Sequence, residues 1–257
     1  MKNPVHPQSN FFIDEDDLPI GAVLSRRQAI KLLSATGGAF LLAACGLTGA
    51  EDSGSSDAAT SQGICVVRPE LTEGPIFVDD QLNRSDVRPD PSNGAVSTGV
   101  LLDLSFRVHQ IVDNTCAPLA NAQVDIWHCD AEGIYSDTDQ LGFDTVGQKF
   151  LRGYQVTDSA GLVNFQTIYP GWYAGRAVHI HFKIRTEDGY DFTSQVFFDE
   201  ELNDDVLSQA PYNARGDRLV RNSQDGIFLD SNNQLLLDVT KTEAGYTTTF
   251  DVALDMS

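Results

Sequence analysis

Short stretches in which apolar and polar side chains alternate recur from about residue 99 to the end of the chain. A period of two residues is typical of a β-strand with one covered face. No stretch shows a sustained helical period, and a single helical turn is expected at residues 204–207. The alternating stretches are residues 99–111, 118–130, 162–170, 179–184, 191–200, 235–239 and 247–256. Seven or eight short strands separated by turn-rich loops predict an all-β fold, a β-sandwich of two mainly antiparallel sheets with long loops.

Two longer segments lack this periodicity and are predicted to be irregular. Residues 64–94 are rich in Pro, Gly and Asp and would form an arm ahead of the first long strand. Residues 132–161 would form a long loop between the second and third strands. With no internal repeat in residues 64–257, we expect these residues to form one domain.

The strand at residues 179–184 has the sequence HIHFKI. Its apolar side chains point one way, so His179 and His181 share the opposite face, about 7 Å apart at twice the rise of a strand. Two imidazoles placed in this way can converge on one metal ion. The alternative is that the two histidines are hydrogen-bonded polar residues that bind no metal. The other residues within reach of them distinguish these two interpretations.

The chain begins with a segment that is typical of an export signal. Arg26 and Arg27 precede an apolar run at residues 32–45 that is shorter than the roughly 20 residues of a membrane span. The run ends in Leu-Ala-Ala-Cys, which resembles the site at which lipoproteins are cleaved and lipidated at the cysteine, here Cys45. We therefore expect residues 1–45 to be a twin-arginine leader that delivers an extracytoplasmic protein, with a possible lipid anchor to the membrane; an ordinary buried or anchoring helix is the alternative. Residues 46–63 are small and polar and would form a flexible tether.

The net charge of −20 makes nucleic acid an improbable partner, because phosphate contacts need Lys and Arg. In an oxidising compartment, a disulfide between Cys65 and Cys116 would tie the start of the domain to the loop after its first long strand. Cys129 lies in a strand-like segment and is predicted to be buried and free. The sequence leaves open whether the chain forms a homodimer.

Several motifs around the histidine strand, taken together, are specific to one family. They are Trp127-His128, Gly133, Tyr135, Arg152-Gly153, Thr157-Asp158, Gly161, and the sequence from Thr167 through Tyr173 and Arg176 to Lys183. With these motifs, residues 69–198 resemble the intradiol ring-cleavage dioxygenases, non-haem ferric enzymes that open catechols between the two hydroxyls. The resemblance is strongest to secreted single-chain members, which are similar to the protocatechuate dioxygenase subunits.

The resemblance implies a set of iron ligands, namely Tyr135, Tyr173, His179 and His181, completed by a solvent hydroxide. Anionic oxygen donors favour Fe(III) over Fe(II), and the metal's charge would keep both tyrosines deprotonated. The expected substrates are a small aromatic diol and O₂, and the expected product is a cis,cis-muconate-type diacid.

The resemblance also implies roles around the substrate. Arg176 would lie over the ring and stabilise negative charge on the attacked carbon. Tyr173 would accept a substrate proton, Gln195 would lie near the substrate and O₂, and Pro75 and Ile76 would line the ring pocket. The segment between Tyr173 and His179 is shorter than in many intracellular relatives, which suggests an open pocket for bulkier, lignin-derived or other plant phenolics.

Two rival interpretations remain. The stretches at residues 118–128 and 157–173 also resemble transthyretin-like and carboxypeptidase-regulatory-like β-sandwiches, which are non-catalytic binding modules on cell surfaces. Such a module does not explain two tyrosines, an arginine and the paired histidines together. A cupin-type metalloenzyme is the second rival, and it would need a carboxylate and a third histidine, for which His109 and His128 are the candidates.

Overall fold

The structure is a computed structural model that describes residues 65–139 and 143–256. The expected leader, with Arg26, Arg27 and Cys45, and the expected tether at residues 46–63 lie outside the described residues. Among the helices of the described part, none has the length and hydrophobicity needed to cross a bilayer.

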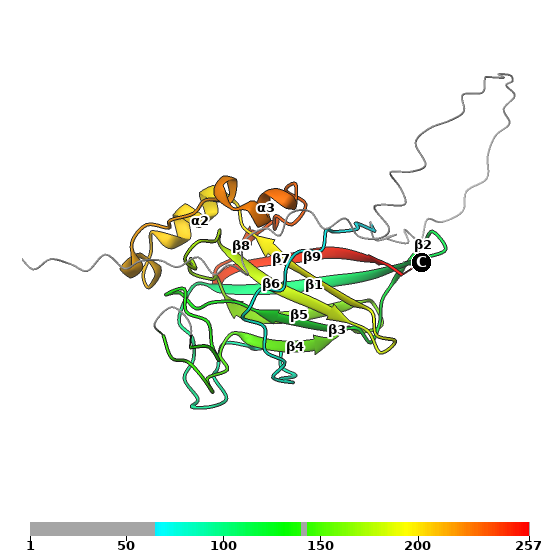
Figure 1. Cartoon of the computed structure of the whole chain (residues 1–257), viewed down its shortest axis with the longest axis horizontal. Helices are drawn as coiled ribbons and strands as arrows, with labels where there is room; N and C mark the ends of the chain where they lie inside the picture. The colour runs from blue at the N-terminus through cyan, green and yellow to red at the C-terminus, as the bar shows by residue number, and fades with distance from the viewer. Residues whose placement is uncertain (1–64, 140–142, 257) are drawn as a thin grey trace, which may run out of the picture. The chain divides into compact units, whose positions relative to one another are not determined.

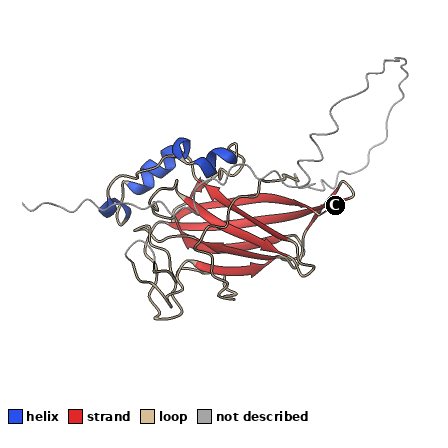
Figure 2. Cartoon of the chain, in the orientation of Figure 1, coloured by secondary structure: helices blue, strands red, loops and turns tan. Residues whose placement is uncertain are grey.

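The described residues form β-strands joined by long loops, with short helical segments gathered after β7 (Figure 2). The strands are β1 Leu101–Val112, β2 Thr115–Pro118, β3 Gln123–Trp127, β4 Arg152–Val156, β5 Leu162–Ile168, β6 His179–Arg185, β7 Asp191–Phe197, β8 Thr240–Lys241 and β9 Gly245–Asp255. The helical segments are α2 Glu200–Leu207, η3 Tyr212–Arg215, η4 Asn222–Gln224 and α3 Gly226–Asp230.

The strands form two sheets. One has the order β2-β1-β9-β8, with β5 also paired to β1, and its β1–β9 pair is parallel. The other has the order β4-β3-β6-β7 and is antiparallel throughout. The prediction of an all-β fold with two mainly antiparallel sheets is confirmed.

The core between the sheets is built from the apolar positions of the alternating strands. Phe106 of β1 packs against Phe182 of β6, with ring centroids 5.0 Å apart, and against Phe250 of β9 at 6.1 Å. Because side chains alternate along a strand, burying Phe182 in this core turns His179 and His181 to the other face of β6.

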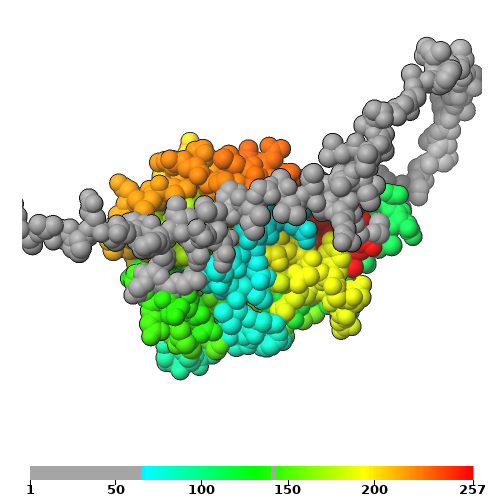
Figure 3. All heavy atoms as spheres, in the orientation of Figure 1, coloured from blue at the N-terminus to red at the C-terminus, as the bar shows by residue number. Residues whose placement is uncertain are grey.

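That other face is covered by the arm that precedes β1, drawn in cyan where it crosses the strands in Figure 1 and as a surface band in Figure 3. Side chains on that face bond to the arm: the Gln195 amide donates to the Thr72 carbonyl at 3.1 Å, and the Arg152 guanidinium donates to the Ile76 carbonyl at 2.7 Å. The alternation indicated a half-buried strand, but the arm buries the histidine face as well.

Two local predictions are wrong, and a third covers only part of the observed element. The expected loop at residues 132–161 contains β4, whose sequence lacks apolar alternation: Arg152 is buried, and residues 153–156 are partly covered or exposed. Residues 235–239 form no strand; Leu236 makes an isolated bridge to Phe197, and the chain then leaves the sheet. The helical turn expected at residues 204–207 is the end of the longer α2, which begins after an Asp199 side chain that accepts from two backbone N–H groups.

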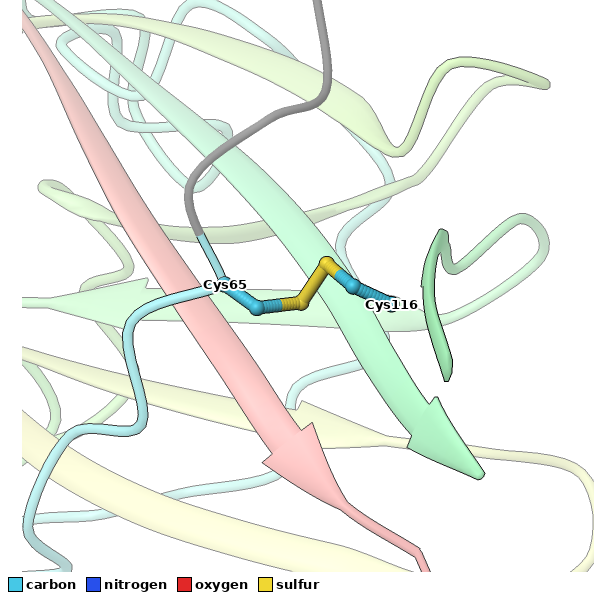
Figure 4. Close-up of a disulfide and its surroundings, with 2 residues drawn as sticks. All are labelled: Cys65 and Cys116. Atoms are coloured by element: carbon cyan, nitrogen blue, oxygen red, sulfur yellow. A yellow bond between two sulfur atoms is a disulfide. The ribbon is translucent and has the colours of Figure 1, made fainter. Parts of the chain in front are cut away.

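The structure joins Cys65 and Cys116 in a disulfide with a Cα–Cα distance of 6.0 Å (Figure 4). The bond attaches the start of the arm to β2, at the end of the β1–β2 hairpin. Cys129 is buried and free, and it lies just after β3 rather than within a strand.

Candidate active site

The register of the four-stranded sheet places side chains of four strands in one row. His181 of β6 lies opposite Trp127 of β3 on one side and Gln195 of β7 on the other, and Trp127 lies opposite Arg152 of β4. Directly opposed residues point to the same face of a sheet. All four side chains therefore lie on the face that the arm covers, and each is buried.

A small cavity lies beside the two histidines. Its walls come from the arm, from the loops that follow β3 and precede β6, and from β6 itself. The lining residues are Gly74, Pro75, Ile76, Tyr135, Tyr173, Arg176, His179 and His181. The structure thus gathers at one cavity the expected metal-binding residues, the expected substrate arginine and the two arm residues expected to contact the ring.

The two histidines converge although their backbone positions are two residues apart. His179 Nε2 lies 3.0 Å from His181 Nε2 and 3.2 Å from the Tyr135 hydroxyl oxygen. His179 Nδ1 lies 2.7 Å from the Ala177 carbonyl oxygen, to which it donates, so its Nε2 presents a lone pair to the cavity. Burial, with a contribution from the nearby Arg176 charge, lowers the pKa of His179 to about 3. Burial, followed by repulsion from His179, likewise holds the pKa of His181 well below its usual value, so both rings are neutral.

Two tyrosines complete the donor set. The rings of Tyr135 and Tyr173 meet edge to face with centroids 5.3 Å apart, and both side chains are buried. The loop that presents Tyr135 is fixed by the Thr145 hydroxyl, which donates to the Tyr135 carbonyl at 2.7 Å. Rigid support of this kind holds a ligand in place before a metal ion arrives.

The donor atoms fit a metal ion. Two ligand atoms bound at about 2.1 Å and at right angles on one ion lie about 3.0 Å apart, which matches the spacings around His179 Nε2. A histidine that ligates through one ring nitrogen commonly donates its other N–H to a carbonyl, as His179 does to Ala177. Within residues 65–139 and 143–256, no group of three or more His, Cys, Asp or Glu is placed to hold a metal ion. The further donors beside these imidazoles are phenolic oxygens.

Arg176 is fixed from two sides in a buried position. Its Nε donates to Asp225 Oδ2 at 3.0 Å, and its Nη2 donates to the Gln195 side-chain oxygen at 2.6 Å. Asp225 Oδ2 also accepts from the Ala177 backbone N–H at 2.7 Å. Burial alone would raise the pKa of Asp225, but Arg176 and the backbone N–H groups hold it below its usual value. The ion pair therefore fixes both the guanidinium and the segment that leads into β6.

Gln195 does not line the cavity in the described structure. It lies behind Arg176, and its amide donates to the Thr72 carbonyl of the arm at 3.1 Å. That this side chain lies near the substrate and O₂ stays a prediction; the structure shows that it contacts the arginine.

Sequence reasoning assigned no role to three residues that shape the site. Asp225 lies 49 positions from Arg176, and the only local signal is its place as the capping residue of α3. Trp127 stacks on His181 with ring centroids 4.8 Å apart. Arg152 donates to the Ile76 carbonyl at 2.7 Å and to the Ser136 hydroxyl at 2.8 Å, so it joins the arm to the Tyr135 loop. The motifs included Trp127 and Arg152, but only the sheet register shows what they contact.

Comparison with known proteins assigns this arrangement to a family. A family model described as Dioxygenase matches residues 72–256, well over half of the chain. Catechol 1,2-dioxygenase 1 of Acinetobacter lwoffii is 26% identical over 208 residues, which are 71% of this chain and 63% of that protein. The chain therefore spans less than two thirds of the length of this curated relative.

Two solved structures are similar over nearly their whole length. The intradiol ring-cleavage dioxygenase from Tetranychus urticae is 31% identical with a TM-score of 0.67, covering 74% of this chain and 95% of that one. The dioxygenase domain of a dioxygenase–carbohydrate-binding fusion protein from Streptomyces sp. SirexAA-E is 28% identical with a TM-score of 0.54, covering 75% and 100%. The transthyretin-like alternative finds no support in these similarities. The chain belongs to the intradiol ring-cleavage dioxygenases, a family of oxidoreductases.

Proposed function

We propose that this protein is a non-haem Fe(III) intradiol dioxygenase that opens catecholic rings with O₂ and yields cis,cis-muconate-type diacids. The observation that supports it best is the convergence of two neutral imidazoles and two tyrosines on one cavity that also contains a buried arginine. Tyr135, Tyr173, His179 and His181 would hold the iron. The two tyrosines would supply hard anionic oxygen donors, which suit Fe(III), and the two histidines would supply nitrogen donors.

A bound ferric ion would act as a Lewis acid that makes the aromatic ring reactive toward O₂. The residues of the chain have their own tasks. The Tyr173 oxygen would accept one proton from the substrate hydroxyls. The Arg176 guanidinium would stabilise negative charge that develops on the ring, in a position that Asp225 and Gln195 fix in advance. Pro75 and Ile76 would contact the ring face and keep water away from it.

The test is the identity of the product. Purified protein loaded with iron is incubated with catechol under ¹⁸O₂, and the product is analysed by mass spectrometry. The proposal predicts a muconate diacid that contains both oxygen atoms of one O₂ molecule. A product opened beside the two hydroxyls instead of between them, or no oxygen uptake by iron-loaded protein, would contradict it.

We further propose that the protein acts outside the cytoplasm after export by the twin-arginine route, with Cys45 as a lipid attachment point. The Cys65–Cys116 disulfide supports this location, because such bonds persist in oxidising compartments. Replacing Arg26 and Arg27 with lysines should retain the protein in the cytoplasm, as measured by cell fractionation. Replacing Cys45 with serine should remove incorporation of labelled fatty acid, and labelling that persists would exclude this cysteine.

A further inference from the structure

A second small cavity adjoins the one that contains the histidines. The two cavities share Ile76, Tyr135 and Tyr173 as a common wall. A ring held beside the histidines would therefore contact side chains that also line the second cavity, here named the annex. The remaining annex side chains come from the loop after β3 and are Ile134, Thr138 and Phe143.

No described residue that lines the annex is positively charged. Its lining side chains in the described residues are apolar or uncharged at neutral pH. Transferring a carboxylate from water into such a place without a partner costs several kcal/mol, as a general rule. An alkyl group, by contrast, gains free energy when it leaves water.

The charge around the first cavity also disfavours a carboxylated substrate. Arg176 is the one residue of its lining that is positive at neutral pH, and its guanidinium already bonds to Asp225 and Gln195. The chain as a whole has a net charge of −20, which repels anionic aromatics at a distance.

We propose that the annex is a subsite for an uncharged apolar ring substituent, so that the protein prefers alkyl-substituted catechols to carboxylated ones. This inference rests on the proposed function and narrows its substrate class. Phe143, 43% exposed at the mouth of the annex, and Ile134 inside it would contact the substituent.

The test compares 4-ethylcatechol with 3,4-dihydroxybenzoate on the full-length, iron-loaded protein. Dissociation constants are measured by calorimetry without oxygen, and kcat/KM is measured with oxygen. We expect 4-ethylcatechol to bind at least about tenfold more tightly than 3,4-dihydroxybenzoate, with the same order in kcat/KM. Equal or tighter binding of the carboxylated compound would overturn the inference. Because binding is measured without turnover, a failure of ring cleavage alone would count against the proposed function and not against the annex.

A matched pair of variants tests where the selectivity arises. Phe143→Lys places a cation at the annex and should move the binding ratio about tenfold toward 3,4-dihydroxybenzoate. Val146→Lys makes the same charge change on the same loop, at a 66% exposed side chain that lines neither cavity. It should move the ratio less than about twofold, because exposed charges are screened by solvent and salt. A shift of equal size in both variants would show that general charge, and not the annex, sets the preference.

Discussion

The buried pair between Arg176 and Asp225 gives the sharpest prediction about how the site is held. Asp225 Oδ2 accepts from Arg176 and from the Ala177 N–H, and Oδ1 accepts from the Ile227 and Phe228 N–H groups at the start of α3. Asparagine caps a helix about as well as aspartate, so Asp225→Asn should leave α3 in place. The loss should fall on Arg176, whose buried charge would lose its ion pair with the Asp225 carboxylate.

Breaking a buried ion pair on one side costs about 3–5 kcal/mol, and we expect Asp225→Asn to lose about 3 kcal/mol because the amide oxygen can still accept one bond. The assay is urea unfolding followed by tryptophan fluorescence. Asp230→Asn is the matched control, since Asp230 is an exposed residue at the other end of α3 and should cost less than about 0.5 kcal/mol.

The stability difference should also depend on pH in one direction. The pKa of Asp225 is depressed in the folded protein, so the ion pair contributes fully above the unfolded value of about 3.9. As the pH falls through the depressed folded pKa, Asp225 becomes neutral, and the wild-type protein loses its advantage over Asp225→Asn. Equal stability of Asp225→Asn and Asp230→Asn at pH 7, or a difference that does not shrink in acid, would refute the reasoning.

Other substitutions test what the disulfide, a buried histidine and a turn glycine contribute to stability. Cys116→Ser opens a loop whose ends are 51 residues apart in sequence and should lower the unfolding free energy by about 4 kcal/mol, whereas reduced wild type should match the variant. Burial lowers the pKa of His128 to about 4. As the pH falls below 6.5, this histidine therefore binds a proton in the unfolded chain before it does so in the folded protein. Wild-type stability should therefore fall by up to about 3 kcal/mol between pH 6.5 and 4, and the profile of His128→Gln should be flatter there. Gly161 and Gly189 both have positive φ, but a Cβ at Gly161 would lie 2.2 Å from the Val108 carbonyl oxygen, while one at Gly189 meets nothing within 4 Å. Gly161→Ala should therefore be destabilising by at least about 2 kcal/mol more than Gly189→Ala, and equal losses in urea unfolding would contradict this.

The strands that the sequence predicted best are those with one apolar face against the other sheet. Leu104 and Phe106 on β1, and Phe182 on β6, alternate with polar residues because only one side of each strand meets the core. The sequence did not predict β4, because its sequence RGYQV has no alternation of apolar and polar residues. Its pairing with β3 is made by backbone hydrogen bonds, which need no apolar side chains. Residues 235–237 show the reverse case: Leu235 and Leu237 are buried, but the segment makes only an isolated bridge at Leu236 and no strand.

Some features of the candidate site could also be predicted from the sequence, and others could not. The two histidines could be placed on one face from the strand period alone, and the tyrosines and Arg176 came from motif resemblance. The contacts that hold them in place were not predictable, because Asp225, Arg152 and the arm reach the site across long sequence separations. A one-dimensional pattern records which way a side chain points, but it does not record what packs against that side chain from another part of the chain.

The central claim is that Tyr135, Tyr173, His179 and His181 together bind Fe(III). The most direct measurement is the visible absorption spectrum of the purified protein with its iron content quantified, before and after anaerobic addition of catechol. The account predicts about one iron per chain and a red-brown band from tyrosinate-to-Fe(III) charge transfer that shifts when catechol binds, and a weaker, displaced band in Tyr135→Phe. A protein that stays colourless and iron-free after reconstitution, or a Tyr135→Phe variant with an unchanged spectrum, would contradict it.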